Sequence, residues 1–388
     1  MKVTKLFSEF FNSEKAGGLV LIACTSLSLI IANSSTGETY NNFWEMKLAG
    51  LSIVHWVNDG LMAIFFLLIG LELEREIYIG ELSTPKDAML PIFAAIGGIL
   101  LPAGIYLFFN NNSPTQAGIG IPMATDIAFA LGILSLLGKR VPLALKVFLT
   151  ALAIIDDLCA ILVIAIFYTK TLLLSHLFIA LGIFGGLLIL NRLKVYSLIW
   201  YILGGIAMWY FMLRSGVHAT ITGVLLAFAI PFEKGGAKSI SYKLQHWLHK
   251  PVAFFILPIF ALANTAIIFE SDIAAVFAAN YGIGIAAGLI VGKPLGILAL
   301  CLIAVYTGIC KLPPGIKWAH LIGAGCLAGI GFTMSIFITL LAFEDAVIIN
   351  NSKLVILFSS LFAGLLGFIV LRLTLKKISG EQTPETIL

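Results

Sequence analysis

Two adjacent carboxylates, Asp156 and Asp157, lie inside the apolar run of residues 151–167. Apolar residues continue on both sides, and a bilayer crossing takes about 20 such residues for a hydrocarbon core about 30 Å thick. Placing one carboxylate at that depth costs roughly 2.5–3.5 kcal/mol on the most lenient scale. The alternative, a helix end at which both carboxylates face water, does not suit apolar flanks of this length. The pair therefore predicts a site for a cation or a proton.

Two glycine-rich segments predict interrupted helices. Residues 118–132 contain Pro122, which removes a backbone donor, and Thr125 and Asp126 follow shortly after it. Residues 323–335 are also rich in glycine, which weakens a helix, although close helix packing is an alternative there. Non-helical backbone at membrane depth is tolerated only where protein or a water-filled cavity surrounds it. The two segments together therefore indicate a transporter site.

One lysine stands near the middle of an apolar stretch. Lys293 lies within residues 282–306 and directly precedes Pro294, which disfavours ordinary helix geometry at the lysine. Snorkelling to the membrane interface is the alternative, but about ten apolar or small residues on each side place this lysine too deep for that. A buried lysine needs a carboxylate partner, and the candidates at comparable depth are Asp126, Asp156 and Asp157.

The elements that must position these residues are membrane helices. Hydrophobic residues make up 60% of the 388-residue chain and charged residues 11%, whereas soluble domains carry about 25% charged residues. We therefore expect a single membrane domain over residues 1–388. Apolar length and Gly/Pro punctuation predict twelve helices. They lie near residues 14–33, 53–79, 88–109, 116–137, 143–169, 175–191, 198–213, 216–230, 245–266, 282–306, 318–343 and 354–375.

Basic residues sort onto alternate loops. The N-terminal region, every second loop and the C-terminal tail with Arg372, Lys376 and Lys377 carry most of the 24 Lys and Arg. The opposite loops carry four, which are Lys47, Lys170, Arg214 and Lys353. By the positive-inside rule both termini are cytoplasmic. The net charge of +4 is thinly spread, so a nucleic-acid partner is not indicated, and the five cysteines lack CxxC spacing.

Several polar residues stand near the ends of the predicted helices. Residues 46–53 are expected to form a short hairpin. Asp59 either caps the second helix or lies in an extracytoplasmic funnel. Glu72, Glu74 and Glu76 either mark a wetted cytoplasmic helix end or line a funnel that gathers cations.

Six parts of the chain together resemble the NhaA family of sodium/proton antiporters, over nearly the full length. They are residues 55–66 with 70–76, then 122–130, 151–157, 215–220, 292–296 and 329–335. The resemblance implies an all-α polytopic membrane protein with inverted repeats and two discontinuous crossing helices, the fourth and eleventh spans. NhaA is itself one of the transporters known to have this architecture.

The resemblance also implies roles for individual residues. It makes Asp157 the principal sodium and proton site, Asp156 its partner and Lys293 the cationic neighbour. Thr125 would help to line the site and Asp126 would balance the helix ends. Because adjacent helical residues point in different directions, we expect Asp157 to bind the ion and Asp156 to contact Lys293. Asp126 is expected at the positive N-terminal ends of the half-helices, and Lys293 at the negative C-terminal ends.

The expected function is electrogenic, pH-dependent exchange of Na⁺ or Li⁺ for H⁺ across the bacterial inner membrane, for sodium and pH homeostasis. Oxygens of Asp157, Asp156 and Thr125 would bind the transported ion, and no cofactor is expected. The partners are Na⁺, H⁺ and the lipid bilayer. Whether the protein forms a homodimer is left open, because the loop of residues 34–52 is shorter than the hairpin that pairs subunits in well-known members of the family.

The pH response has several candidate residues, which are Glu72, Glu76, His218, His246 and His249. Each histidine has an alternative: His218 as a structural hydrogen-bonding group, the other two as ordinary surface residues. Gln245 stands where some members carry a glutamate linked to the pH response. We therefore expect direct competition between protons and sodium to dominate.

Two other function classes could use parts of this pattern. A sodium-coupled symporter of a small organic solute would share the broken helices but needs a larger polar cavity. A membrane sensor or scaffold would need no buried carboxylate pair. An ATP-driven pump is disfavoured because the chain has no GxxxxGK[ST] motif.

Overall fold

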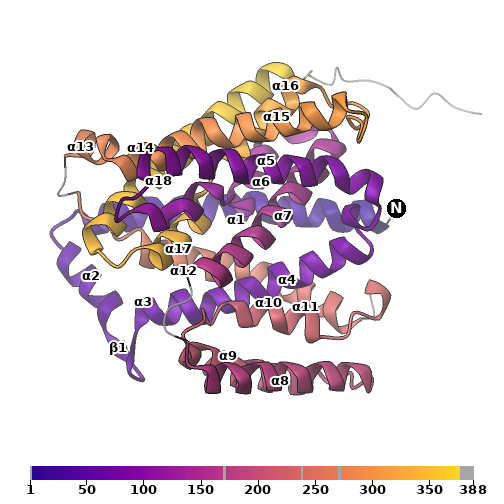
Figure 1. Cartoon of the computed structure of the whole chain (residues 1–388), viewed down its shortest axis with the longest axis vertical. Coiled ribbons are helices and arrows are strands. Elements are labelled where there is room, and N and C mark those ends of the chain that lie inside the picture. Colours follow the sequence, from indigo (N-terminus) through magenta and orange to yellow (C-terminus); the bar gives the residue numbers. More distant parts are fainter. Residues whose placement is uncertain (1, 169–171, 237–238, 270–271, 376–388) are drawn as a thin grey trace, which may run out of the picture.

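The computed structural model describes residues 2–168, 172–236, 239–269 and 272–375, and it is almost wholly helical (Figure 1). The α-helices are α1 (Lys2–Ala32), α2 (Gly37–Glu45), α3 (Ile53–His55), α4 (Met62–Tyr78), α5 (Pro85–Asn110), α6 (Ile127–Leu136), α7 (Leu143–Phe167), α8 (Leu174–Arg192), α9 (Leu198–Ser215), α10 (Ile221–Ala229), α11 (Ile240–Pro251), α12 (Leu257–Asn264), α13 (Ile273–Ala278), α14 (Asn280–Ala287), α15 (Lys293–Tyr306), α16 (Trp318–Ala328), α17 (Phe332–Ala342) and α18 (Ala346–Thr374). Short 3-10 helices are η2 (Glu81–Ser83), η3 (Gln116–Met123), η4 (Gly138–Arg140) and η5 (Glu233–Gly235), and π-helices are η1 (Trp56–Leu61), η6 (Val252–Ile256) and η7 (Gly288–Gly292). The strands are β1 (Lys47–Leu48) and β2 (Leu51–Ser52).

The predicted hairpin at residues 46–53 is confirmed. Strands β1 and β2 pair antiparallel, with Lys47 opposite Ser52. Gly50 takes a left-handed backbone conformation at the turn (φ 87°), which suits glycine because it has no Cβ. The hairpin lies at the left-hand end of the molecule in Figure 1, and α1 begins at the opposite end.

The predicted count of twelve spans is not confirmed. Within the described residues, nine helices are long and apolar enough to cross a membrane, or up to 11 if each of two bent helix pairs is one span. The predicted span 216–230 differs most, because α10 has only nine residues. Gly216 ends α9 in a left-handed conformation (φ 87°). The turn that follows shortens α10 to well under the length that a crossing requires.

One basic residue lies elsewhere than predicted. Lys353 was expected in a loop, but it lies within α18 and is only 8% exposed. The Asp345 side chain accepts hydrogen bonds from the backbone N–H groups of Val347 and Ile348, so the helix begins before residue 354. The predicted loop residue Lys170 and tail residues Lys376 and Lys377 lie outside the described residues.

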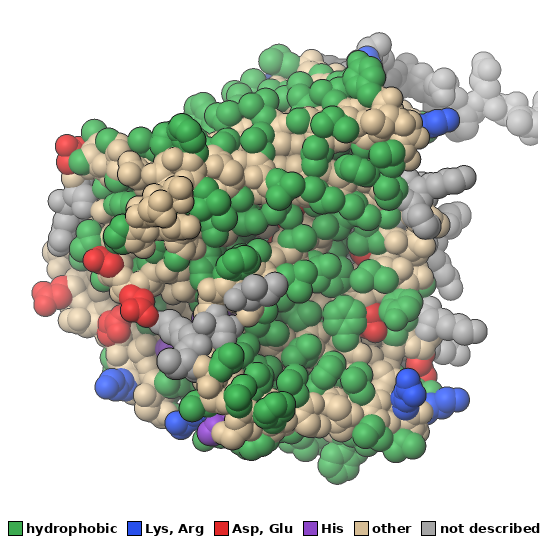
Figure 2. Space-filling view, viewed as in Figure 1, with side chains coloured by type: hydrophobic (Ala, Val, Ile, Leu, Met, Phe, Trp, Pro, Cys, Tyr) green, Lys and Arg blue, Asp and Glu red, His purple; other side chains and the backbone are tan. Residues whose placement is uncertain are grey.

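The surface is divided into an apolar middle and two charged ends. Figure 2 shows hydrophobic side chains over the middle of this face, with Asp and Glu gathered toward the left-hand end and Lys and Arg more common at the right. Exposed acidic residues near the hairpin end include Glu38, Glu45, Asp272 and Asp345. Large apolar side chains on the outside, such as Phe108 and Phe178 at 81% and 68% exposure, suit contact with lipid.

Helix α15 is held against α5 by glycines. A side-chain carbon at Gly97 would overlap the carbonyl group of Gly296, and the reverse also holds, so the two backbones touch. Gly98, next along α5, faces Ile297 and the stem of Lys293. This contact fixes the position of Lys293 along the bundle axis.

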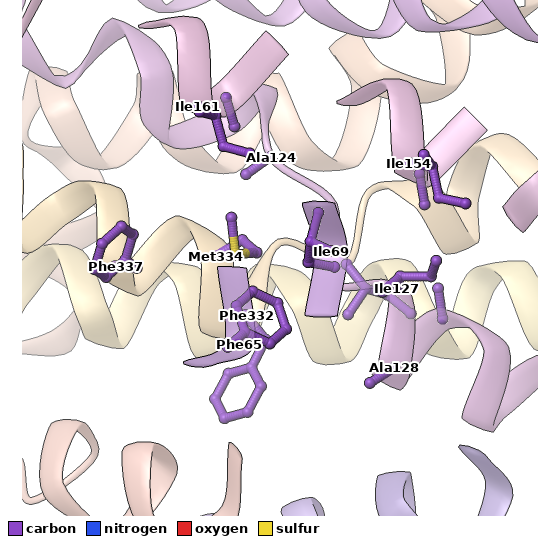
Figure 3. Packing of buried hydrophobic residues seen from close by; sticks show 14 of the residues in the cluster. Phe65, Ile69, Ala124, Ile127, Ala128, Ile154, Ile161, Phe332, Met334 and Phe337 are labelled. Carbon is purple, nitrogen blue, oxygen red and sulfur yellow. The ribbon is translucent and has the colours of Figure 1, made fainter. Parts of the chain in front are cut away.

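Apolar side chains from four parts of the chain surround the centre of the molecule (Figure 3). The ring centres of Phe66 in α4 and Phe337 in α17 lie 5.4 Å apart, and those of Phe129 in α6 and Phe332 in α17 lie 5.6 Å apart. Phe66, Phe332 and Phe337 are almost fully buried. They form the dry packing around the two interrupted helices.

Candidate functional site

Both predicted interruptions are present, and they meet. The segment 116–137 forms η3, then non-helical residues 124–126, then α6. The segment 318–343 forms α16 and α17, which are bent by 45° around residues 329–331. The N–H of Asp126 in the first break donates to the carbonyl of Ile330 in the second at 2.6 Å. The two breaks therefore lie against each other, as expected for crossing broken helices.

Asp126 binds the N-terminal ends of two half-helices. As the N-cap of α6, its Oδ1 accepts a hydrogen bond from the backbone N–H of Phe129 at 2.9 Å. Its Oδ2 accepts from the N–H and the hydroxyl of Thr333 in the first turn of α17, at 3.1 and 2.5 Å. Helix N-termini carry partial positive charge and unsatisfied N–H groups. The predicted position of Asp126 at both N-terminal ends is thus observed.

The C-terminal ends of the other two half-helices receive donors. Thr125 donates its hydroxyl to the carbonyl of Ala328, the last residue of α16, at 2.9 Å. The ammonium group of Lys293 donates to the carbonyl of Met123, the last residue of η3. Ser335 donates to the carbonyl of Ile121 at 2.7 Å. Carbonyl groups freed by the breaks are thereby hydrogen-bonded inside the protein, as membrane depth requires.

The predicted contact between Asp156 and Lys293 is present. The Lys293 ammonium lies 2.9 Å from Oδ2 of Asp156, and both side chains are fully buried. Thr125 donates to the same carboxylate oxygen at 2.7 Å. A charged pair at this depth is stable only with close geometry and further hydrogen bonds, and Thr125 supplies one. Thr125 therefore links the carboxylate to the crossing of the broken helices.

Local helix geometry places Lys293 at this point. The π-helix η7 ends at Gly292, and α15 begins with Lys293 and Pro294. Proline lacks a backbone N–H, which favours such a departure from the regular helix. The predicted irregularity before Pro294 is therefore present, and Lys293 lies at the junction.

Asp157 differs from the other two buried aspartates in its partners. Its side chain is 0% exposed, and neither carboxylate oxygen has a hydrogen-bond partner among the described residues. The charges of Asp156, Asp126 and Lys293 lie within electrostatic range of it. A carboxylate buried without donors is expensive. Both oxygens of Asp157, together with Oδ1 of Asp156, which also lacks a partner among the described residues, are therefore left for an ion or a proton.

The acidic residues at the end of α4 are not a wetted helix end. Glu72 and Glu74 are 9% and 5% exposed, because α4 packs against α10 and α11 there. Glu72 lies 3.9 Å from Nδ1 of His249 and within hydrogen-bonding reach of Gln245. Glu76 is only partly buried. The wetted-end interpretation is thus wrong for Glu72 and Glu74.

An aromatic contact also joins α4 to α11. The Arg75 guanidinium lies over the ring of Tyr242 at 5.3 Å from its centre. The ring of His246 stacks on that of Tyr242, one turn earlier in α11, with ring centres 6.4 Å apart. The candidate pH-response residues Glu72, His246 and His249 therefore belong to one interface between α4 and α11.

Two further predicted residues lie away from the crossing. The Nε2 atom of His218 is 3.0 Å from the carbonyl of Tyr168, whose hydroxyl donates to the carbonyl of Ala117 at 2.7 Å. This contact fits the interpretation of His218 as a structural hydrogen-bonding group. Asp59 lies 2.9 Å from Nε2 of His55. The capping alternative for Asp59 is wrong, because Ser52 caps that helix.

Sequence reasoning missed two groups of the site. Thr333 supplies two hydrogen bonds to Asp126, and the Met123 carbonyl accepts from Lys293. Thr333 carried a signal, since it follows the second glycine-rich break. The carbonyl of Met123 gave no such signal, because every residue has a backbone carbonyl.

Comparison with known proteins places the whole chain in one family. Residues 8–371 match the sequence profile of the family described as Na⁺/H⁺ antiporter 1. A Na(+)/H(+) antiporter NhaA from Flavobacterium psychrophilum is 67% identical over 376 residues, which cover 97% of this chain and 98% of that protein. A Na(+)/H(+) antiporter NhaA from Cytophaga hutchinsonii is 62% identical over 387 residues, covering 99% and 100%.

The fold is also similar to that of a solved structure. The sodium proton antiporter MjNhaP1 from Methanocaldococcus jannaschii, at pH 8, matches with a TM-score of 0.54 over 97% of this chain and 99% of that one. Sequence identity is 16%, so this likeness concerns the fold alone. From the profile match and the close relatives together, the chain belongs to the Na⁺/H⁺ antiporter 1 family, that of the NhaA antiporters.

Proposed function

We propose that the chain exchanges Na⁺ for H⁺ across the cytoplasmic membrane, with Asp157 as the group that the two ions occupy in turn. The observation that carries the proposal is the contrast in hydrogen bonding at the crossing. Asp126 accepts three hydrogen bonds, and Asp156 is paired with Lys293 and Thr125. Asp157 has no partner among the described residues. Its charge is therefore the one left to be neutralised by cargo.

Competition between the two ions follows from this arrangement. A proton on the Asp157 carboxylate removes the charge that attracts Na⁺, and Na⁺ in turn excludes the proton. Oxygen donors suit a small hard cation, so Asp157, Asp156 and Thr125 would bind Na⁺ or Li⁺. No resident cofactor is assigned. The transported ion is cargo, and one site that accepts only one ion at a time is enough for exchange.

The pair of Asp156 and Lys293 provides a second proton step. When Na⁺ approaches Asp157, its positive charge disfavours the nearby ammonium, which lies in the same electrostatic range. Release of one proton from Asp157 and one from the Asp156–Lys293 pair would accompany each Na⁺. Exchange would then move net charge across the membrane and respond to the membrane potential.

Alternating access would come from movement of one helix bundle against another around the crossing. The hydrogen bonds between residues 124–126 and residues 328–333 keep the two broken helices together at the breaks. We infer that both termini and the end of α4 face the cytoplasm, from the charge distribution along the chain. A single transport domain over residues 1–388 fits this arrangement, and a homodimer remains a proposal for direct measurement.

The symporter alternative receives no support. The relatives compared above are named antiporters. Buried apolar side chains surround the crossing (Figure 3). The ionisable groups at this depth suit a bare ion.

The test is transport by the purified protein in proteoliposomes with an acid interior. Added Na⁺ should dequench an internal pH probe in the wild type, with no organic solute present. Asp157→Asn should abolish the signal while the protein still inserts and folds, because removing a costly buried charge need not destabilise the helix. Glu38→Gln, an exposed charge change near the hairpin, should transport normally.

Two results would contradict the proposal. Substantial Na⁺-driven proton movement by Asp157→Asn would remove this residue from its central role. Na⁺-dependent uptake of an organic solute by the wild type, without dequenching of the pH probe, would favour a symporter. Electrogenicity is checked by clamping the membrane potential with K⁺ and valinomycin, since the rate should change with the imposed potential.

A further inference from the structure

A hollow lies away from the crossing of the broken helices. It has a volume of about 570 Å³ and is found at the ends of α4, α8 and α10. In Figure 1 these ends lie on the side of the molecule opposite the β-hairpin. The side chains around it include Glu74, Tyr78, Asn191, Phe228, Phe232 and Glu233. The volume is within the range of about 300–1,000 Å³ that small-molecule sites occupy.

Close helix packing determines where this hollow opens. A Cβ on Gly70 of α4 would lie 2.6 Å from the Cβ of Ala227, so α4 and α10 are in near backbone contact. Glu74 follows Gly70 by one helical turn and lies on the same face. Helix α10 ends at Ala229, whose carbonyl accepts a hydrogen bond from Asn191 of α8 at 2.9 Å. The carboxylate of Glu74 therefore stands just beyond the end of α10.

Two acidic side chains, Glu74 and Glu233, line the hollow. Glu74 is 5% exposed, and its Oε2 has no hydrogen-bond partner among the described residues. Glu233 is exposed at the rim and accepts a hydrogen bond from the hydroxyl of Tyr196. Neither carboxylate forms an ion pair within the described part of the chain. A buried carboxyl group with an unpartnered oxygen is stabilised either by a proton or by a counter-charge, and a cationic ligand in the hollow can supply the counter-charge.

Aromatic rings form much of the rest of the wall. The rings of Tyr78 and Phe232 lie with their centres 5.2 Å apart and are tilted by 34°. Phe228 adds a third ring. Aromatic faces attract organic cations, and cages of such rings recognise quaternary ammonium groups. A bare Na⁺ or Ca²⁺ would instead require several oxygen ligands. The combination of rings and carboxylates thus favours a cation with an apolar surface.

We propose that this hollow binds an organic ammonium group, held by the Glu74 carboxylate and the rings of Tyr78 and Phe232. Two sources present that chemistry at the membrane surface. One is a soluble amine such as choline, and the other is the ammonium of a zwitterionic lipid headgroup. The site is separate from the transport function proposed above, and its test measures binding, so either can fail without the other.

The first experiment is calorimetric titration of the full-length protein in detergent with choline chloride. The matched probe is 3,3-dimethyl-1-butanol, which has nearly the shape of choline but no charge. The wild type should bind choline saturably and the alcohol at least about tenfold more weakly, the difference expected when a desolvated cation–π contact and a charge pair are lost. Equal binding of both probes would overturn the proposal, because the hollow would then be merely apolar.

Three variants locate the binding. Glu74→Gln and Phe232→Leu should each weaken choline binding about tenfold or more. Glu233→Gln changes an exposed residue that tolerates substitution, so it keeps the test informative if Glu74→Gln does not fold. Glu38→Gln, the same charge change near the hairpin, should bind as the wild type does. Unchanged affinity in Glu74→Gln, or in Phe232→Leu if Glu74→Gln does not fold, would overturn the proposal.

A second arm separates the two sources. The protein is placed in nanodiscs with equal amounts of phosphatidylcholine and phosphatidylglycerol, and lipids retained by the protein are measured by native mass spectrometry. Enrichment of phosphatidylcholine in the wild type but not in Glu74→Gln assigns the site to a headgroup. Choline binding without that enrichment assigns it to a soluble cation. If the wild type shows no choline binding and no enrichment of phosphatidylcholine, the ammonium site is refuted.

Discussion

Replacing Lys293 by methionine should destabilise the protein strongly, although the side chain keeps almost the same shape. Methionine keeps the length of the lysine stem, so the packing against Gly98 is retained and the loss is mainly electrostatic. The ammonium contacts Oδ2 of Asp156 at 2.9 Å and also the carbonyl of Met123. Removing one partner of a buried pair leaves the other charge uncompensated, which costs about 3–5 kcal/mol.

The structure also predicts how that loss can be reversed. After Lys293→Met, the Asp156 carboxylate keeps only the hydroxyl of Thr125 as a donor among the described residues. Asp156→Asn in the same chain removes the orphaned charge, so the double variant should be more stable than Lys293→Met alone. The coupling between the two sites should be a large part of the 3–5 kcal/mol, since coupled neighbours are far from additive.

The assay is reversible unfolding in mixed micelles, followed by circular dichroism as the fraction of denaturing detergent rises. Lys353→Met is the matched control, because Lys353 is also buried but has no ion pair within the described residues. Its removal should cost little or should stabilise. Lys293→Met with wild-type stability, or a double variant no more stable than the single one, would refute the counter-ion role of Lys293.

Three further predictions concern the same region. Asp126→Ala should destabilise by about 1 kcal/mol or more for each of the two half-helix ends that it caps, which the same unfolding assay measures; wild-type stability would argue against the caps. Gly97→Ala should destabilise by about 1–3 kcal/mol and slow exchange, since its Cβ would overlap the backbone of Gly296, whereas Gly182→Ala, which meets nothing within 4 Å, should do neither. The apparent sodium KM in proteoliposomes should rise about tenfold per pH unit for each competing proton below the pKa of the site, and Gln245→Glu should leave this slope unchanged. A maximal rate that collapses at acid pH even in saturating sodium would require a separate sensor.

The interruptions could be predicted from sequence because their cause is local. Pro122 lacks a backbone donor and glycines weaken a helix, so the break before Thr125 needs no information from elsewhere in the chain. The same holds for the irregular geometry beside Pro294. Depth in the membrane was also predictable for Asp156, Asp157 and Lys293, because it follows from the length of the apolar flanks. These features reside in single segments.

What could not be predicted depends on contacts between segments. Depth alone left three aspartates as partners for Lys293, and it was the family resemblance that singled out Asp156. The position of Lys293 itself depends on the backbone contact of Gly97 in α5 with Gly296 in α15. Glu74 looked like a wetted residue because its own helix ends nearby, but α10 covers it. The shortness of α10 depends on the turn after Gly216, and apolar composition does not report a turn.

The three buried aspartates show how identical side chains at one depth acquire different tasks. Asp126 is surrounded by donors from two helix ends, and a carboxylate held in that way is costly to move. Asp156 has one cationic partner and one hydroxyl, so its charge is balanced yet can respond to a nearby ion. Asp157 has neither among the described residues. A transported cation must displace whatever neutralises its ligand, so the group with the fewest internal partners is the one that can exchange cargo at low cost. Under the proposed function, the number of donors at each carboxylate, rather than its depth, therefore separates a structural charge from a transport site.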